Sequence, residues 1–102
     1  MNSLTKLRVA TSIKWPVLYA NRDLIGQGTL LEFSDAGCQV MGTMPVAVGM
    51  ILKVWISPEH REEALFIKEA RVVWAHAQRF GLELREMDDQ DHAWLIRYLK
   101  EE

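Results

Sequence analysis

One segment of the sequence stands apart: Gly28–Val40, which reads GTLLEFSDAGCQV. Its first half alternates in the manner of a half-buried β-strand, so we predict a strand over residues 27–34. Successive side chains of a strand point to opposite faces. Leu30, Glu32 and Ser34 are therefore expected on one face, and Phe33 is expected on the other.

The second half of this segment predicts a turn and a returning strand. Ser34-Asp35-Ala36-Gly37 begins with Ser and ends with Gly, as type I turns commonly do. Gly37 also permits a tight turn and a close approach of another part of the backbone. We expect a short strand over residues 38–41 after the turn.

Four further strands are expected around this hairpin, because their apolar residues alternate and turn residues separate them. One precedes the hairpin and three follow it, over residues 15–20, 50–56, 65–75 and 80–85. In the longest of these strands, four apolar residues are expected on one face: Phe66, Ala70, Val72 and Trp74. Six short strands at these intervals predict a small antiparallel barrel.

The last part of the chain changes to the period of a helix. Asp88 and Asp89 are residues that begin helices, and Asp91 adds negative charge where the helix dipole favours it. An apolar stripe follows at helical spacing: Trp94, Leu95, Tyr98 and Leu99. We therefore predict one domain over residues 1–102, all-β with one C-terminal helix. It has an arm over 1–13, a six-stranded antiparallel β-barrel over 14–86, and a helix over 88–101.

Composition and charge limit the classes of function. The chain has 102 residues, of which 49% are hydrophobic and 25% are charged, as in ordinary globular domains. A net charge of −2 argues against binding to nucleic-acid polymers, which are held mainly through their phosphates. The single cysteine excludes an internal disulfide and favours a reducing cytoplasm. We expect no targeting segment and no membrane insertion, because no apolar stretch is long enough for either.

Side chains that catalyse reactions or bind metals do not occur here in the required spacings. His60, His76 and His92 lie sixteen residues apart, and no pair has the spacing of metal ligands. Cys38 lacks a CxxC partner, so we expect a small buried residue and not a nucleophile. Nucleophile-elbow and phosphate-loop motifs are missing from the sequence. We therefore expect neither an enzyme nor a metal or cofactor site.

Large apolar side chains are assigned mainly to the core. The four tryptophans lie in separate elements with apolar neighbours, so we predict core packing for Trp15, Trp55, Trp74 and Trp94. Three methionines cluster around Pro45: Met41, Met44 and Met50. They are expected to fill gaps in the core, with an adaptable partner surface as the alternative.

The segment around Glu32 resembles the signature strand of PilZ domains. That signature has an acidic or amide residue, then Ser two positions later, then Gly three positions after the Ser, as Glu32, Ser34 and Gly37 do here. Further matches follow the family's order between residues 6 and 100: Trp15-Pro16-Val17, Pro45–Gly49, Val73-Trp74, Phe80–Leu84 and Tyr98-Leu99. The family fold is a six-stranded antiparallel barrel with a C-terminal helix, which agrees with the strand count above.

The resemblance implies recognition of cyclic di-GMP, a bacterial second messenger with two phosphates and two guanines. Family members use an N-terminal RxxxR motif, whose guanidinium groups bind phosphate and the guanine Hoogsteen edge. The matching positions in this chain are Lys6 and Ala10, so the motif is degenerate. Lys6 and Arg8 are the cations that remain for a phosphate.

The resemblance also implies that the signature strand contributes to the ligand site. Glu32 and Ser34 are expected to face one ligand, with Gly37 beside them. Glu32 departs from the usual Asp or Asn, and its extra methylene moves the carboxylate. On spacing alone, Glu32 and Ser34 also fit the solvated face of a strand.

Two functions stay open from the sequence. One is a regulatory cyclic di-GMP receptor with a weak or degenerate site formed by Lys6, Arg8, Glu32, Ser34 and Gly37. The alternative is a PilZ-like adaptor that does not bind nucleotide and acts through an unknown protein partner. The oligomeric state and the pathway stay open as well.

Overall fold

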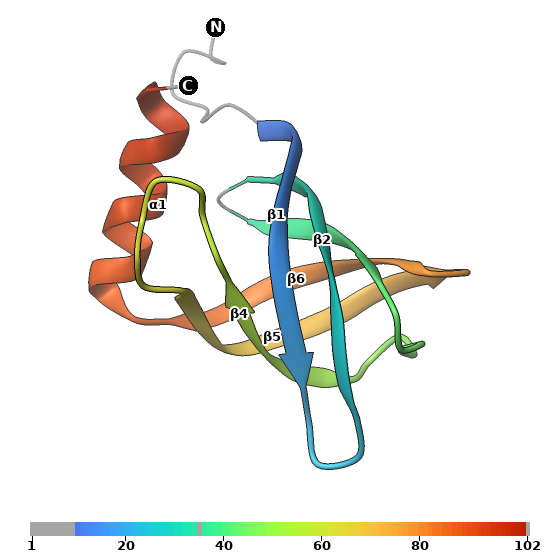
Figure 1. Cartoon of the computed structure of the whole chain (residues 1–102). Helices are drawn as coiled ribbons and strands as arrows, with labels where there is room; N and C mark the ends of the chain where they lie inside the picture. The colour runs from blue at the N-terminus through green and yellow to red at the C-terminus, as the bar shows by residue number, and fades with distance from the viewer. Residues whose placement is uncertain (1–9, 35, 102) are drawn as a thin grey trace, which may run out of the picture.

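The computed structural model describes residues 10–34 and 36–101, and the side chains of residues 14–34 and 36–100. Six strands and one helix make up this described part: β1 (Ala10–Ala20), β2 (Ile25–Phe33), β3 (Gly37–Gly42), β4 (Ile51–Ile56), β5 (Leu65–His76), β6 (Arg79–Met87) and α1 (Asp89–Glu101). Each paired neighbour is antiparallel, and the order β1-β2-β3-β6-β5-β4 closes into a barrel (Figure 1). The predicted barrel with a C-terminal helix is confirmed.

The first strand is longer than the sequence indicates. Residues 10–13, which the sequence analysis assigns to the arm, belong to β1. The pairing of β1 with β2 shifts between Thr11 and Trp15, and Lys14 has a φ of 58°. A register shift of this kind is a β-bulge, which breaks the alternation that sequence patterns detect. The predicted start at Trp15 is the point where regular pairing begins.

The core fills the inside of the barrel and the space under α1. Its fully or nearly buried members come from all seven elements: Trp15, Val17, Tyr19, Leu30, Phe33, Cys38, Val40, Leu52, Val54, Ile56, Leu65, Ile67, Ala70, Val72, Phe80, Leu82, Leu95 and Leu99. Tyr19 fixes the loop after β3, because its hydroxyl donates to the Met44 carbonyl at 2.6 Å and accepts from the Met44 amide at 2.9 Å. Gly26 and Gly42 lie against the Tyr19 ring, where a Cβ would collide with it.

The faces of β2 differ from the prediction. Leu30 and Phe33 are both fully buried although they are three residues apart, because the pairing with β3 shifts between Leu30 and Glu32. The bulge resets the alternation. Glu32 and Ser34 still share a face, as predicted, but Leu30 lies on the opposite one.

Bulges also change the faces of β5. Ala70 and Val72 are buried as predicted, whereas Trp74 is 40% exposed and Phe66 lies half-buried on the outer side. The pairing of β5 with β6 shifts at three places, which separates residues that a regular strand would keep together. The predicted core role of Trp74 is therefore wrong.

The remaining tryptophans and the methionines have mixed positions. Trp15 is buried and Trp94 packs against the core, as predicted. Trp55 is half-buried on the outer face of β4, so its predicted core role is wrong. Met50 packs against the core, but Met41 and Met44 are 38% and 41% exposed, so the prediction that they fill gaps in the core is wrong. Met41 lies near the end of β3 and Met44 in the loop that follows it, and both side chains are at the surface, where few partners surround them.

α1 begins at Asp89 because Asp88 caps it. The Asp88 carboxylate accepts from the amides of Gln90 at 3.0 Å and Asp91 at 3.4 Å. Two residues of the predicted apolar stripe, Leu95 and Leu99, are fully buried against the barrel. The helix lies next to the loop between β4 and β5 (Figure 1).

An ion pair links α1 to that loop. Asp91 is 8% exposed, and its carboxylate pairs with the Arg61 guanidinium and accepts from the Phe66 amide at 3.1 Å. The Arg61 guanidinium also lies over the Trp94 ring, 5.4 Å from its centre. Asp91 is thus a structural anchor of the helix, in addition to the favourable position in the first turn that the sequence indicates.

Candidate functional site

A hollow of about 180 Å³ lies on the barrel wall where β2 turns into β3. Its lining comes from β2, the turn, β3 and β5: Glu32, Phe33, Ser34, Gly37, Cys38, Gln39 and Trp74. Of the five predicted site residues, the hollow brings together Glu32, Ser34 and Gly37. Lys6 and Arg8 lie outside the described residues.

Polar groups at this hollow face each other across the β2–β3 ladder. Glu32 is exposed and pairs in register with Gln39 of β3. Within the described residues, the Glu32 carboxylate makes no hydrogen bond or ion pair, so it can accept bonds from a ligand. The Gln39 amide can both donate and accept. A carboxylate next to an amide suits the polar edge of a planar heterocycle.

Ser34 holds the turn and keeps its hydroxyl nearly free. Its amide donates to the Gly37 carbonyl at 2.9 Å, which closes the turn. Its hydroxyl donates to the same carbonyl and accepts from the Ala36 amide, both at 3.4 Å. These two contacts are long for hydrogen bonds and therefore weak. A ligand can thus compete for the hydroxyl at little cost.

Gly37 is needed for packing between strands. Its φ does not lie in the left-handed region, so the turn itself does not require glycine here. A Cβ at this position would instead overlap the carbonyl oxygen of Leu82 on β6. Of the two roles that the sequence indicates for Gly37, the close approach of another backbone is the one observed.

Trp74, like Gln39, is a lining residue that the sequence analysis missed. Its indole lies over Gly81, the residue opposite it on β6, where a Cβ would collide with the indole nitrogen. The sequence carries a faint signal, because a glycine inside a strand often marks a close approach. The partner of that glycine depends on the β5–β6 register, which the sequence does not show.

The N-terminal end of β1 lies beside the hollow. Thr11 pairs with Glu32, and Ala10 pairs with Phe33. Chain position 10, which the sequence analysis aligns with the second arginine of the RxxxR motif, is therefore next to the strand that carries Glu32.

Cys38 lines the hollow only with the edge of a buried side chain. It is 8% exposed, and burial raises the pKa of its thiol to about 12. The thiol stays protonated near neutral pH and is a poor nucleophile. Cys38 is the small buried residue that the sequence predicts.

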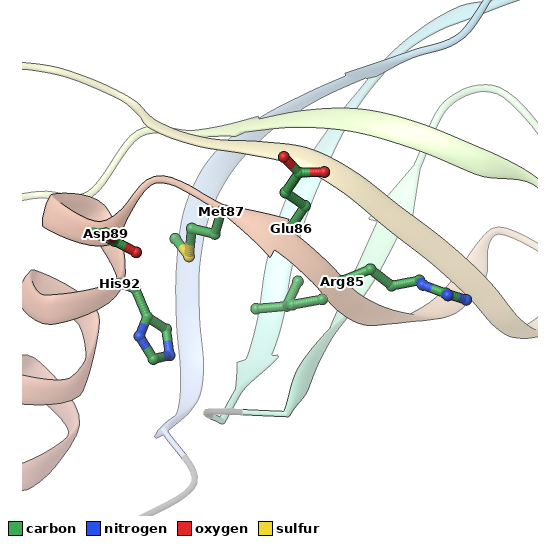
Figure 2. A pocket seen from close by; sticks show the side chains of 6 residues that line it. Arg85, Glu86, Met87, Asp89 and His92 are labelled. Atoms are coloured by element: carbon green, nitrogen blue, oxygen red, sulfur yellow. The ribbon is translucent and has the colours of Figure 1, made fainter.

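A second hollow, of about 220 Å³, lies where β6 passes into α1 (Figure 2). Figure 2 shows that the side chains of Arg85 and Glu86 project away from each other. Each is paired outside the hollow, Arg85 with Glu69 and Glu86 with Lys68, both at 3.5 Å. The charged groups of this hollow do not converge on a common point. In the part of the chain that the structure describes, no three His, Cys, Asp or Glu side chains gather in a manner that could hold a metal ion.

The closed barrel, the terminal helix and the hollow at the β2–β3 turn together define a small β-barrel domain with a hollow on its surface. A family model, that of the PilZ domain, matches residues 6–101. The chain therefore belongs to the PilZ domain family, as the signature strand indicates. PilZ domains are a family of cyclic di-GMP receptors.

The chain is also similar to a solved structure, the PilZ domain of CeSA from a cellulose synthesizing bacterium. The two share 22% sequence identity, with a TM-score of 0.68 over 90% of this chain and 94% of the other. At this identity the likeness shows the fold. A comparison with curated proteins finds no match. Among the described helical residues, none forms a stretch long and apolar enough to cross a membrane.

Proposed function

We propose that this PilZ domain is a regulatory receptor that binds cyclic di-GMP weakly. The observation that carries the proposal is the hollow at the β2–β3 turn, which Glu32 and Ser34 line together. Membership of the PilZ family supplies the class of ligand. We propose a binding role and not a catalytic one, with cyclic di-GMP as ligand and without a cofactor.

Glu32 and Ser34 would read one guanine. A carboxylate can accept two hydrogen bonds from the donors on the Watson–Crick edge of guanine, and the Ser34 hydroxyl can donate or accept beside it. Trp74 would contact the same base with its exposed indole. The hollow measures about 180 Å³, below the range of about 300–1,000 Å³ that is typical of small-molecule pockets. We therefore expect it to take one base, with the rest of the ligand outside.

The phosphates need cations that the hollow does not supply. Glu32 is the charged side chain among the described lining residues, and its charge repels phosphate. We propose Lys6 and Arg8 for this role, supported by the position of the N-terminal end of β1 beside Glu32. Lysine lacks the planar fork of arginine, and Ala10 carries no charge. Each lost charged contact costs about 1.5–3 kcal/mol, or about ten- to a hundredfold in affinity, which is why we expect a weak site.

Titration calorimetry with cyclic di-GMP at low and moderate salt tests the proposal. We expect saturable heat at ligand concentrations up to about 100 μM. A dissociation constant of about 100 μM corresponds to a binding free energy of about −5.5 kcal/mol. Glu32→Ala and Ser34→Ala should each abolish it. Glu63→Ala is the matched control, because Glu63 is an exposed acid in the loop before β5 and lies outside the hollow lining.

Absence of heat from the intact chain would contradict nucleotide binding, and the adaptor alternative would replace it. Binding heat that persists in both Glu32→Ala and Ser34→Ala would show that the ligand binds at another part of the surface. We propose the bacterial cytoplasm as the location, supported by the nature of the ligand and by the buried free thiol of Cys38.

A further inference from the structure

An apolar row crosses the barrel wall away from the hollow. Leu18 of β1 pairs with Trp55 of β4, and Trp55 pairs with Phe66 of β5. Residues directly opposite each other in an antiparallel ladder project to the same face. Their chain neighbours Val54 and Leu65 are fully buried, so this row faces outward. Leu18 is 40% exposed, and the rings of Trp55 and Phe66 stack with centres 5.2 Å apart.

Two hollows extend this row along β1 and β4. One, of about 390 Å³, is bounded by Leu18 and Trp55 among other residues. The other, of about 540 Å³, has Ile51 in its lining, and Ile51 is 43% exposed. We call the surface formed by Leu18, Ile51, Trp55 and Phe66 with these two hollows the β1–β4 wall. A hollowed apolar surface of this kind is a common docking site for a partner.

The β1–β4 wall is basic on a chain of net charge −2. The larger hollow is lined by Arg22, Lys53 and Lys68 and by one acid, Glu69. Glu69 is already paired with Arg85 at 3.5 Å. Lys68 lies 3.5 Å from Glu86, but both side chains are more than half exposed, and such pairs contribute little. The cations of the wall therefore favour an acidic partner.

We propose that the β1–β4 wall docks an acidic amphipathic helix of a partner protein. Among the described strands the barrel is closed, so a partner cannot add a strand at a free edge. A folded segment with apolar side chains on one face can instead bind as an amphipathic helix that lies along an apolar groove. This inference does not depend on the nucleotide site, which lies on β2, β3 and the far end of β5.

The spacing of the wall defines the helix. Ile51 and Trp55 lie four residues apart on one face of β4, which separates them by about 13 Å. A helix covers this distance in about eight residues. Its apolar side chains would then lie at positions i and i+8, which share a face, and an acid at i+4 would lie over Lys53.

Selection from a displayed library of helical peptides of about 16 residues, randomised on one face, tests this proposal with the full chain as target. We expect enriched peptides to carry an acid midway between two apolar residues at the i and i+8 spacing. Lys53→Glu and Ile51→Ser should each weaken these peptides by about tenfold or more, because both change the exposed wall. Lys100→Glu is the matched control: it reverses an exposed charge on α1 and should change affinity by less than about twofold. Circular dichroism verifies that each variant is folded.

Three outcomes would overturn the proposal. They are the absence of any enriched peptide, enrichment of basic peptides, and acidic peptides whose affinity Lys53→Glu leaves unchanged. Sedimentation with phosphatidylglycerol vesicles examines the other occupant that a basic, apolar surface can take. Vesicle binding that Lys53→Glu abolishes, without enriched acidic peptides, would assign the wall to a lipid surface in place of a helix.

Discussion

The indole of Trp74 covers Gly81, the residue opposite it on the neighbouring strand. Since Gly81 has no side chain, the ring can lie flat against the backbone of β6 and form one side of the hollow that Glu32 and Ser34 also line. One wall of the candidate ligand site is thus made possible by a residue that contributes no atoms of its own beyond the backbone.

Gly81→Ala should destabilise the domain by about 1–3 kcal/mol, because its Cβ overlaps the indole of Trp74. The neighbour in this collision is a side chain, so Trp74→Ala should recover most of that loss in the double variant. Urea denaturation of the two single variants and the double variant measures the coupling.

Gly37→Ala is the matched control for this cycle. Its Cβ would meet the Leu82 carbonyl, which belongs to the backbone and cannot be removed by a side-chain substitution. Trp74→Ala should therefore leave the cost of Gly37→Ala unchanged. Equal recovery in both cycles would show that Trp74 does not lie against Gly81.

Asp91→Ala should lower the free energy of unfolding by about 3 kcal/mol. The substitution leaves the Arg61 guanidinium and the Phe66 amide without their partner in a mostly buried place. Urea denaturation measures the loss. Lys68→Ala, which breaks a well-exposed pair, should cost no more than about 0.5 kcal/mol. A loss for Asp91→Ala as small as that would mean that the ion pair does not anchor α1.

The Cys38 thiol should make stability depend on alkaline pH. Burial raises its pKa from 9.0 to about 12, so the folded state holds its proton more tightly than the unfolded state. The stabilisation that the protonated thiol contributes is fully present below about pH 9 and is lost as the pH rises toward 12. Over this range the free energy of unfolding falls by up to about 1.4 kcal/mol per pH unit. Comparison with Cys38→Ala at each pH isolates it from other titrating groups.

The same thiol should react slowly with Ellman's reagent at pH 8 in the folded protein and quickly in urea. Rapid reaction of the folded protein would show that Cys38 is accessible, and the pH dependence above would then have another source.

Lys6→Arg combined with Ala10→Arg should tighten the binding of cyclic di-GMP by about tenfold or more, because each guanidinium restores a charged, bidentate contact. Calorimetry of the double variant beside the original chain measures the gain. Substitution of both positions by Glu is the control and should eliminate the heat of cyclic di-GMP binding. If the arginine variant binds no better, the weakness of the site lies in Glu32 or in the barrel wall.

Much of the fold could be predicted because its signals are local. The turn at residues 34–37, the apolar alternation of β3 and β6 and the helical stripe that includes Leu95 and Leu99 are all patterns within one segment. The positions of Glu32 and Ser34 on one face could be predicted for the same reason. Trp74 could not be assigned to the candidate site, because its place depends on bulges between β5 and β6 that leave no periodic trace.

The strands, the helix and the family could be predicted from the chain alone, since each follows from the period and order of its residues. Only the folded chain shows which face each bulged strand presents, that Trp74 lies over Gly81, and that Arg61 reaches Asp91, thirty residues away. The physical reason is that closing a barrel sets the register between strands, and register is a relation between distant segments that local periodicity does not contain.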